Sequence, residues 1–190
     1  YYLAATTWAD ASVGLTMRKA PTIAELKEAE PVQIFQDSTP DRCCNFWAPE
    51  FFLLDGPNGK RWYGYYTGGA AGEDFVNTQF QHVIESEGTD PMGPYHYKGK
   101  LVERNALDAT VMEHGGKLYA VYSVWNETQD LALQEMSSPR ETSPSPPCRG
   151  RCRPTPSTRD PWPSTGTDAP SWCSRRARAG DRTTSWACSS

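Results

Sequence analysis

The sequence predicts an all-β fold in residues 1–138, followed by a tail that cannot form a core of its own. Short runs of aromatic and β-branched residues recur along the first part, and Gly, Pro, Asn and Asp separate them, which is typical of strands joined by turns. The 52 residues from Pro139 onward contain no Ile, Leu, Val, Phe, Tyr or Met. Such a segment buries too little apolar surface to offset the entropy lost on ordering, so we expect it to be disordered.

The expected strands are short and closely spaced. Residues 55–59 (Asp-Gly-Pro-Asn-Gly) and 114–116 (His-Gly-Gly) tolerate tight turns, so each is expected to close a hairpin. Thr22–Ala29 is the one stretch that we expect to be helical. The predicted strands are Tyr1–Thr7, Val13–Met17, Val32–Phe35, Phe51–Leu54, Arg61–Thr67, Gln79–Ile84, Tyr95–Lys98, Ala109–Glu113, Lys117–Val124 and Leu131–Met136.

A repeated unit favours a propeller over a sandwich or a barrel. Phe51–Leu54, a glycine turn and Trp62–Tyr66 parallel Thr110–Glu113, a glycine turn and Leu118–Tyr122. The period is roughly 60 residues, somewhat longer than most propeller repeats. In a propeller each unit is a four-stranded blade that stacks on its neighbours, so we expect a partial β-propeller of about two and a half blades with an apolar face left open.

The net charge divides the chain at the same place. Residues 1–138 hold 10 Lys and Arg against 19 Asp and Glu, a net charge of −9, whereas residues 139–190 hold nine Arg, no Lys and four acids, a net charge of +5. We therefore assign residues 1–138 to the partial propeller and residues 139–190 to a separate tail. As one alternative, the tail is a genuine disordered linker whose basic charge binds acidic surfaces or nucleic acid.

The cysteines and histidines indicate neither a metal site nor a disulfide framework. Cys148 and Cys152 have no following Cys/His pair, which a zinc site of that spacing needs, and the three histidines show no ligand spacing. Cys43 and Cys44 are adjacent, and neighbouring cysteines bridge only with strain. We expect the cysteines to be unpaired.

Two motifs are candidates for sugar chemistry. Asp108 precedes a strand and has apolar neighbours; it is either a turn former or a carboxylate aimed into a central pocket. Trp47–Glu50 joins a flat ring to a rigid turn and a carboxylate. Aromatic rings stack on the faces of sugars and carboxylates hold their hydroxyls, although a core Trp beside a surface Glu fits the pattern equally well.

Taken in order, several motifs resemble glycoside hydrolase family 43, the arabinan- and xylan-trimming enzymes. The segments between Trp47 and Tyr95 resemble the second blade of that family and the stretch that closes it, and those between Leu107 and Pro139 resemble its third blade. The similarity covers some 135 residues, and its strength comes from the order of the motifs rather than from any one of them. The matching segments are Trp47–Glu50, Trp62–Thr67, Glu85–Ser86, Asp90–Tyr95, Leu107–Val111, Gly116–Tyr122 and Met136–Pro139.

The resemblance implies a five-bladed propeller with a pocket at its axis and an inverting mechanism that uses three carboxylates. By motif position Asp108 matches the second of them, which tunes the pKa of the general acid and orients the substrate. In an inverting enzyme the acid and base stand roughly 6.5–9.5 Å apart to admit water. The resemblance also assigns substrate binding at the pocket mouth to Trp8, Trp47, Glu50 and Trp125.

The general base and general acid have no match in the sequence. The family places the base before the strand at Tyr1, and the first residues read as a strand interior rather than a signal peptide, so we expect a truncated start. The acid should follow Met136, where the composition is that of GC-rich DNA translated in a shifted frame. In the neighbouring frame, permissible codons around Thr158–Pro161 encode Glu-Gly-Pro, the sequence around the family's acid. On this hypothesis Asp160 is not a catalytic residue.

These observations predict a glycosidase, of which this chain is an inactive fragment. We expect the parent to be an inverting α-L-arabinofuranosidase or arabinanase; the alternatives are a β-xylosidase of the same family and a non-catalytic carbohydrate-binding propeller. The expected partner is plant cell-wall arabinan or arabinoxylan, with no nucleic acid and no membrane, since no apolar run approaches the ~20 residues of a span. We expect a monomer without a cofactor, although some family members hold a central metal ion. The resemblance favours secretion over a cytoplasmic location.

Overall fold

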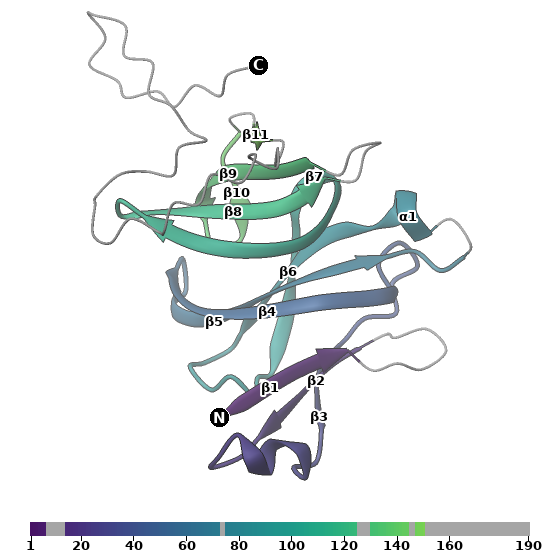
Figure 1. Ribbon diagram of the computed structural model, residues 1–190, viewed down its shortest axis with the longest axis vertical. Coiled ribbons are helices and arrows are strands. Elements are labelled where there is room, and N and C mark those ends of the chain that lie inside the picture. Colours follow the sequence, from purple (N-terminus) through teal and green to yellow (C-terminus); the bar gives the residue numbers. More distant parts are fainter. Residues whose placement is uncertain (7–13, 73–74, 125–129, 145–146, 151–190) are drawn as a thin grey trace, which may run out of the picture.

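The computed structural model describes residues 1–6, 14–72, 75–124, 130–144 and 147–150 and confirms the all-β, partial-propeller prediction (Figure 1). Three layers of antiparallel strands are stacked, with β1 to β3 (between Tyr2 and Gln36) at the bottom of the view, β4 to β6 (between Cys44 and Ser86) in the middle and β8 to β10 (between Lys117 and Thr142) at the top. The long strand β7 (Tyr95–His114) runs from the middle layer into the top one. In these residues no helix is long and apolar enough to cross a membrane.

The first layer is a three-stranded sheet that corresponds to blade one. The predicted helix at Thr22–Ala29 is reduced to the 3₁₀ turn η1, in which Thr22 Oγ1 accepts a hydrogen bond from the backbone N–H of Glu25 at 3.3 Å. Arg18 fastens this turn to the sheet by donating to the carbonyls of Lys27 and Ala29. The elements are β1 (Tyr2–Thr6), β2 (Gly14–Lys19), η1 (Ala24–Lys27) and β3 (Val32–Gln36).

Blades two and three share one long strand. The first part of β7 pairs with β6 as far as Asn105, and its second part pairs with β8 from Ala106 onward. The predicted strands at Tyr95–Lys98 and Ala109–Glu113 are thus the two ends of a single strand, whose polar residues between them concealed its continuity. The elements are β4 (Cys44–Gly56), β5 (Gly59–Gly69), α1 (Phe75–Thr78), β6 (Phe80–Ser86), β7 (Tyr95–His114), β8 (Lys117–Val124), β9 (Asp130–Ser138), β10 (Glu141–Thr142) and β11 (Cys148–Gly150).

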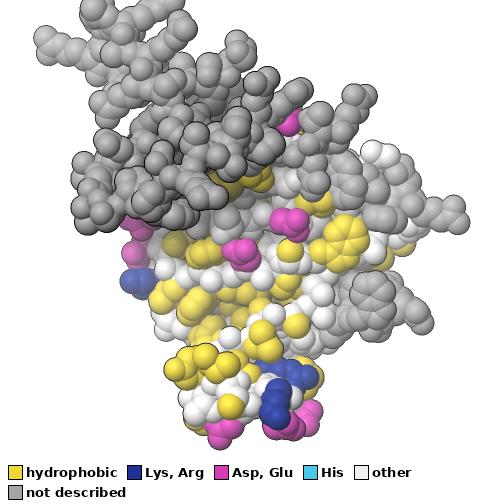
Figure 2. All heavy atoms as spheres, viewed as in Figure 1, with side chains coloured by type: hydrophobic (Ala, Val, Ile, Leu, Met, Phe, Trp, Pro, Cys, Tyr) yellow, Lys and Arg dark blue, Asp and Glu magenta, His cyan; other side chains and the backbone are white. Residues whose placement is uncertain are grey.

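The core lies between the layers, as stacking of blades requires. Two hydrophobic clusters are distinct, one between blades one and two and one between blades two and three. Figure 2 shows hydrophobic side chains over the middle layer, with acidic side chains among them. The first cluster includes Leu15, Phe35, Phe46, Tyr66 and Tyr95; the second includes Tyr63, Tyr65, Val111, Tyr122 and Met136.

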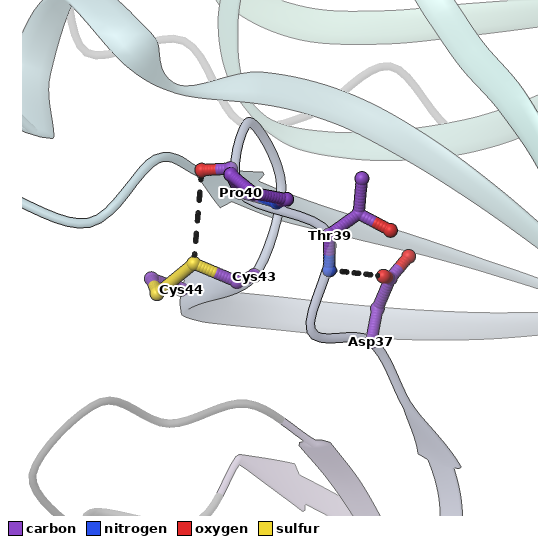
Figure 3. Close-up of a disulfide and its surroundings, with 5 residues drawn as sticks. All are labelled: Asp37, Thr39, Pro40, Cys43 and Cys44. Atoms are coloured by element: carbon purple, nitrogen blue, oxygen red, sulfur yellow. Dashed lines mark hydrogen bonds between the residues drawn. A yellow bond between two sulfur atoms is a disulfide. The ribbon is translucent and has the colours of Figure 1, made fainter.

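The prediction of unpaired cysteines is wrong for Cys43 and Cys44, which form a disulfide (Figure 3). The preceding loop is held in a turn by Asp37, which accepts hydrogen bonds from the backbone N–H of Thr39 at 2.9 Å and from Arg42 Nε at 2.6 Å. Both cysteines are buried where this loop enters β4. The expectation weighed only the strain of an adjacent pair, whereas the folded loop brings the two sulfur atoms together.

Part of the segment assigned to the tail belongs to the folded unit. Tyr65 Oη donates to the carbonyl of Pro139 at 2.6 Å, and Arg140 Nη2 lies 2.6 Å from Glu85 Oε2. The strand β10 then pairs with β9 as far as Thr142, and β11 pairs with β9 at Leu131–Leu133, so the fold extends to Gly150. Amino-acid composition did not predict that this segment is folded, because backbone pairing and an ion pair hold it in place rather than apolar side chains. Residues 151–190, including Asp160, lie outside the described residues.

Candidate active site

Asp108 lies in a β-bulge of blade three. Leu107 pairs with Ser123 and Thr110 with Val121, so two residues of β7 face the single residue Tyr122 of β8. Asp108 has φ of 52°, in the left-handed region, where Asp is one of the few residue types enriched besides Gly. Its side chain is exposed. The bulge therefore turns the carboxylate out of the hydrogen-bonded ladder, as bulges next to active sites do.

The same bulge occurs in blade two, at Ala48. Trp47 pairs with Thr67 and Glu50 with Tyr65, so Ala48 and Pro49 face one residue of β5. Ala48 has φ of 44°. Because Ala48 and Asp108 are about 60 residues apart, the bulge follows the period of the sequence repeat.

The two bulges are connected through Thr67. The backbone N–H of Asp108 donates to Thr67 Oγ1 at 3.3 Å, and Thr67 is the residue that pairs with Trp47. The structure thus connects Asp108 and Trp47, both predicted from the sequence, to the same residue, Asp108 through a hydrogen bond to the Thr67 hydroxyl and Trp47 through strand pairing with Thr67. Trp47 is half-buried and Glu50 is exposed. Glu50 lies on the other side of the bulge, nearer the β4–β5 hairpin, where it pairs with Tyr65. Trp8 and Trp125, the other two predicted sugar-binding residues, lie outside the described residues.

Sequence reasoning missed three buried polar residues of blade two, one of which, Thr67, bonds to the Asp108 backbone. Thr67, Gln81 and His82 have no exposed surface, and they occupy adjoining positions on β5 and β6. In a sequence they look like the solvent face of a strand. The available signal was the alternation of polar residues in Gln79–His82, where a core strand normally carries aliphatic side chains.

His82 is neutral and structural. Burial lowers the pKa of its imidazole to about 4, against a smaller opposing effect of the Gly68 carbonyl. The Nε2–H group therefore donates to that carbonyl at 3.0 Å, and Nδ1 accepts from the Tyr97 hydroxyl at 3.1 Å. With both ring nitrogens engaged, His82 is not placed to act as an acid or base.

A buried carboxylate, Glu85, lies at the hairpin end of blade two. Glu85, 1% exposed, accepts from Tyr63 Oη at 2.9 Å and pairs with Lys98 at 3.2 Å and Arg140 at 2.6 Å. Burial alone would raise the pKa of this carboxyl, but the hydrogen bonds from these three groups outweigh it and hold the pKa below its usual value. Since Arg140 belongs to blade three and Tyr63 to blade two, the cluster joins the two blades.

Two hollows open elsewhere on the described surface. One, of about 470 Å³, is lined by residues of β3 and β7, including Ile34 and Tyr97; the other, of about 400 Å³, adjoins Glu85 and Lys98. Neither is lined by Asp108 or Trp47. No group of three or more His, Cys, Asp or Glu within the described ranges is arranged to hold a metal ion.

Solved structures resemble this fold, whereas no family model and no curated protein sequence matches the chain. An α-L-arabinofuranosidase from Lactobacillus brevis superposes with a TM-score of 0.65 at 25% identity, covering 78% of this chain and 49% of that one. An endo-arabinase from Bacteroides thetaiotaomicron gives 0.56 at 18% identity over 78% of this chain and 50% of its own. A thermostable family-43 glycoside hydrolase gives 0.56 at 20% identity over 84% of this chain and 50% of its own.

The blades and their bulges give the chain the fold of part of a β-propeller, similar to that of these glycoside hydrolases. The chain spans about half the length of the structures that it matches. The resemblance to glycoside hydrolase family 43 is confirmed at the level of the fold.

Proposed function

We propose that this chain is part of an inverting glycosidase that acts on α-L-arabinofuranosyl linkages in arabinan or arabinoxylan. The observation that carries the proposal is the bulge at Asp108, which presents an exposed carboxylate and bonds through its backbone to Thr67, the residue paired with Trp47, in a fold similar to that of an α-L-arabinofuranosidase. The parent enzyme is proposed to need two further carboxylates, one to protonate the leaving oxygen and one to activate water on the opposite face of the sugar.

In this proposal Asp108 is the second of the three carboxylates, which tunes the pKa of the general acid and orients the substrate by accepting hydrogen bonds from sugar hydroxyls. A hydrogen bond to a charged group contributes about 1.5–3 kcal/mol, enough to fix the orientation of a bound sugar. Trp47 is proposed to supply a flat apolar surface on which the ring stacks, and Glu50 a second acceptor. Asp108 is the one family carboxylate that motif position identifies in the described residues, so the 190-residue polypeptide is proposed to bind the glycan without hydrolysing it.

The test combines an activity assay with a binding assay on the 190-residue polypeptide. We expect no p-nitrophenol from the α-L-arabinofuranoside or the β-xyloside, and heat of binding on titration with an arabinan oligosaccharide. Turnover that Asp108→Ala abolishes would overturn the assignment as an inactive fragment. The glycoside that is then hydrolysed faster would decide between α-L-arabinofuranosidase and β-xylosidase activity. Absence of both turnover and binding would overturn the carbohydrate assignment for this chain.

The frame hypothesis is tested separately by the genomic DNA. We expect the frame adjacent to the one encoding residues 151–190 to encode Glu-Gly-Pro. A polypeptide that combines the family's acid and base with Asp108 should then release p-nitrophenol from the α-L-arabinofuranoside. If no frame through this region encodes Glu-Gly-Pro, the hypothesis of a shifted frame fails.

A further inference from the structure

The backbone N–H of Asp108 is bonded to the neighbouring blade instead of to its own sheet. In a bulge one residue is left out of the ladder, so its backbone N–H needs another acceptor. That acceptor is Thr67 Oγ1, which lies 41 residues earlier in the chain, in blade two. The conformation of Asp108 therefore depends on a side chain of a different blade.

The Thr67 hydroxyl is itself held in place by Gln81. Gln81 Nε2 donates to Thr67 Oγ1 at 2.5 Å and lies 3.4 Å from the carbonyl of Ala106. Thr67 and Gln81 pair across β5 and β6, and neither has any exposed surface. Together they bond to the backbone on both sides of Leu107, at Ala106 and at Asp108.

The corresponding position in blade three also carries a hydroxyl. Ser123 pairs with Leu107 as Thr67 pairs with Trp47, each immediately before the bulge, and Ser123 is 8% exposed. A buried hydroxyl at the same register in both blades indicates a recurring polar position. In blade two the hydroxyl bonds to the bulge of the following blade.

We propose that Thr67 and Gln81 are positioning residues that fix the bulge carrying Asp108 and so aim its carboxylate at the sugar. This inference rests on the proposed function for the role of Asp108, but the hydrogen bonds that it invokes can be tested without it. Removing the acceptor frees the Asp108 N–H and allows the strained left-handed residue to relax toward the regular ladder.

The matched variants are Thr67→Val, which keeps the shape and removes the acceptor, and Thr67→Ser, which keeps the acceptor. Amide hydrogen exchange at Asp108 should accelerate about tenfold in Thr67→Val, the effect of losing one hydrogen bond, and stay within about threefold of wild type in Thr67→Ser. The affinity for an arabinan oligosaccharide, measured by calorimetry, should fall about tenfold in Thr67→Val and recover in Thr67→Ser.

The outcomes separate the two proposals. Unchanged exchange at Asp108 in Thr67→Val overturns the positioning role. Faster exchange with an affinity that neither Thr67→Val nor Asp108→Asn alters supports the hydrogen bond but overturns the role of Asp108 in sugar binding. An affinity lost in Asp108→Asn and kept in Thr67→Val supports the site and overturns the positioning.

If Thr67→Val fails to fold, Gln81→Met provides the test, since it removes both Nε2 contacts and leaves Thr67 intact. We expect exchange at Asp108 to accelerate less in this variant than in Thr67→Val, by roughly threefold. Exchange equal to wild type at Asp108 in folded Gln81→Met would overturn the role of Gln81.

Discussion

Blades two and three contain the same backbone bulge with different side chains. At Ala48 the bulge carries a methyl group, and at Asp108 it carries a carboxylate. Both residues occupy left-handed φ, where a non-glycine side chain is costly. The bulge is therefore a feature of the blade backbone, whereas the carboxylate occurs at the bulge of blade three and not at that of blade two.

The residues opposite the two bulges also differ. Tyr66, opposite the Ala48 bulge, packs against His82 with ring centroids 5.4 Å apart, and the Tyr66 hydroxyl has no hydrogen-bond partner among the described residues. Tyr122, opposite the Asp108 bulge, donates to Gln134 Oε1 at 2.8 Å. Blade two is therefore supported by a titratable side chain and blade three by an amide that does not titrate.

The largest expected effect concerns the connection between the two blades. Glu85→Gln removes the charge that Lys98 and Arg140 share, and we expect the free energy of unfolding to fall by about 2–3 kcal/mol, the value for hydrogen bonds to a charged group. Urea denaturation measures it. The control is Glu87→Gln, which removes an exposed pair with His96 and should cost about 0.5 kcal/mol or less. Equal losses in the two variants would contradict a stabilising role for the buried cluster of Glu85, Lys98 and Arg140.

The next effect distinguishes the blades by pH. His82 has a folded pKa of about 4 against 6.5 in the unfolded chain, so below pH 6.5 the unfolded state takes up the proton first. Stability from this group is complete above pH 6.5 and is lost as pH falls toward 4. We expect a loss of about 2 kcal/mol between pH 7 and pH 5, absent in His82→Gln.

Hydrogen exchange locates the same effect in the structure. At pH 5 the protection of residues around Ala48, whose facing residue Tyr66 packs against His82, should fall more than that of residues around Asp108, whose facing residue Tyr122 bonds to Gln134. The two carboxyls whose pKa values are lowered, Asp37 and Glu85, contribute to pH dependence only below about pH 4.5, their usual range. A uniform loss of protection across both blades would contradict the proposed difference.

The smallest effect tests whether the bulges are equivalent. Glycine adopts left-handed φ without steric cost, so Ala48→Gly and Asp108→Gly should both raise the free energy of unfolding, by about 0.5–1 kcal/mol. The gain should be smaller at Asp108, because Asp tolerates this conformation better than Ala does. Calorimetric titration with an arabinan oligosaccharide should show lost affinity in Asp108→Gly alone. Loss of affinity in both variants would mean that the bulge, rather than the carboxylate, is what the sugar requires.

The sequence predicted the fold well because its signals are local. Hairpin glycines, the aromatic runs of Trp62–Tyr66 and Leu118–Tyr122, and their period indicated strands and blades that the structure confirms. The shared strand β7 was missed because Glu103, Arg104 and Asn105 interrupt the apolar pattern where the strand passes from one blade to the next.

The site was only partly predictable. Motif position singled out Asp108 and Trp47, but the bonds from Thr67 and Gln81 to the Asp108 bulge span 41 and 25 residues of sequence and leave no local pattern. The pairing of Arg140 with Glu85 spans 55 residues and falls in a segment whose composition indicates a tail. Contacts of this kind depend on how the blades stack, and a local sequence pattern does not predict that stacking.

Sugar binding at the Asp108 bulge is the property on which the proposed function depends. Its most direct test is NMR titration of the labelled 190-residue polypeptide with an arabinan oligosaccharide, following backbone amides and tryptophan indoles. We expect the largest shift changes at the Asp108 amide and the Trp47 indole, with little change at Leu118 and Tyr119, which pair with β7 nearer its hairpin with β8. Shift changes confined to Gln33–Gln36 and Tyr95–Tyr97, around the hollow between β3 and β7, would contradict it.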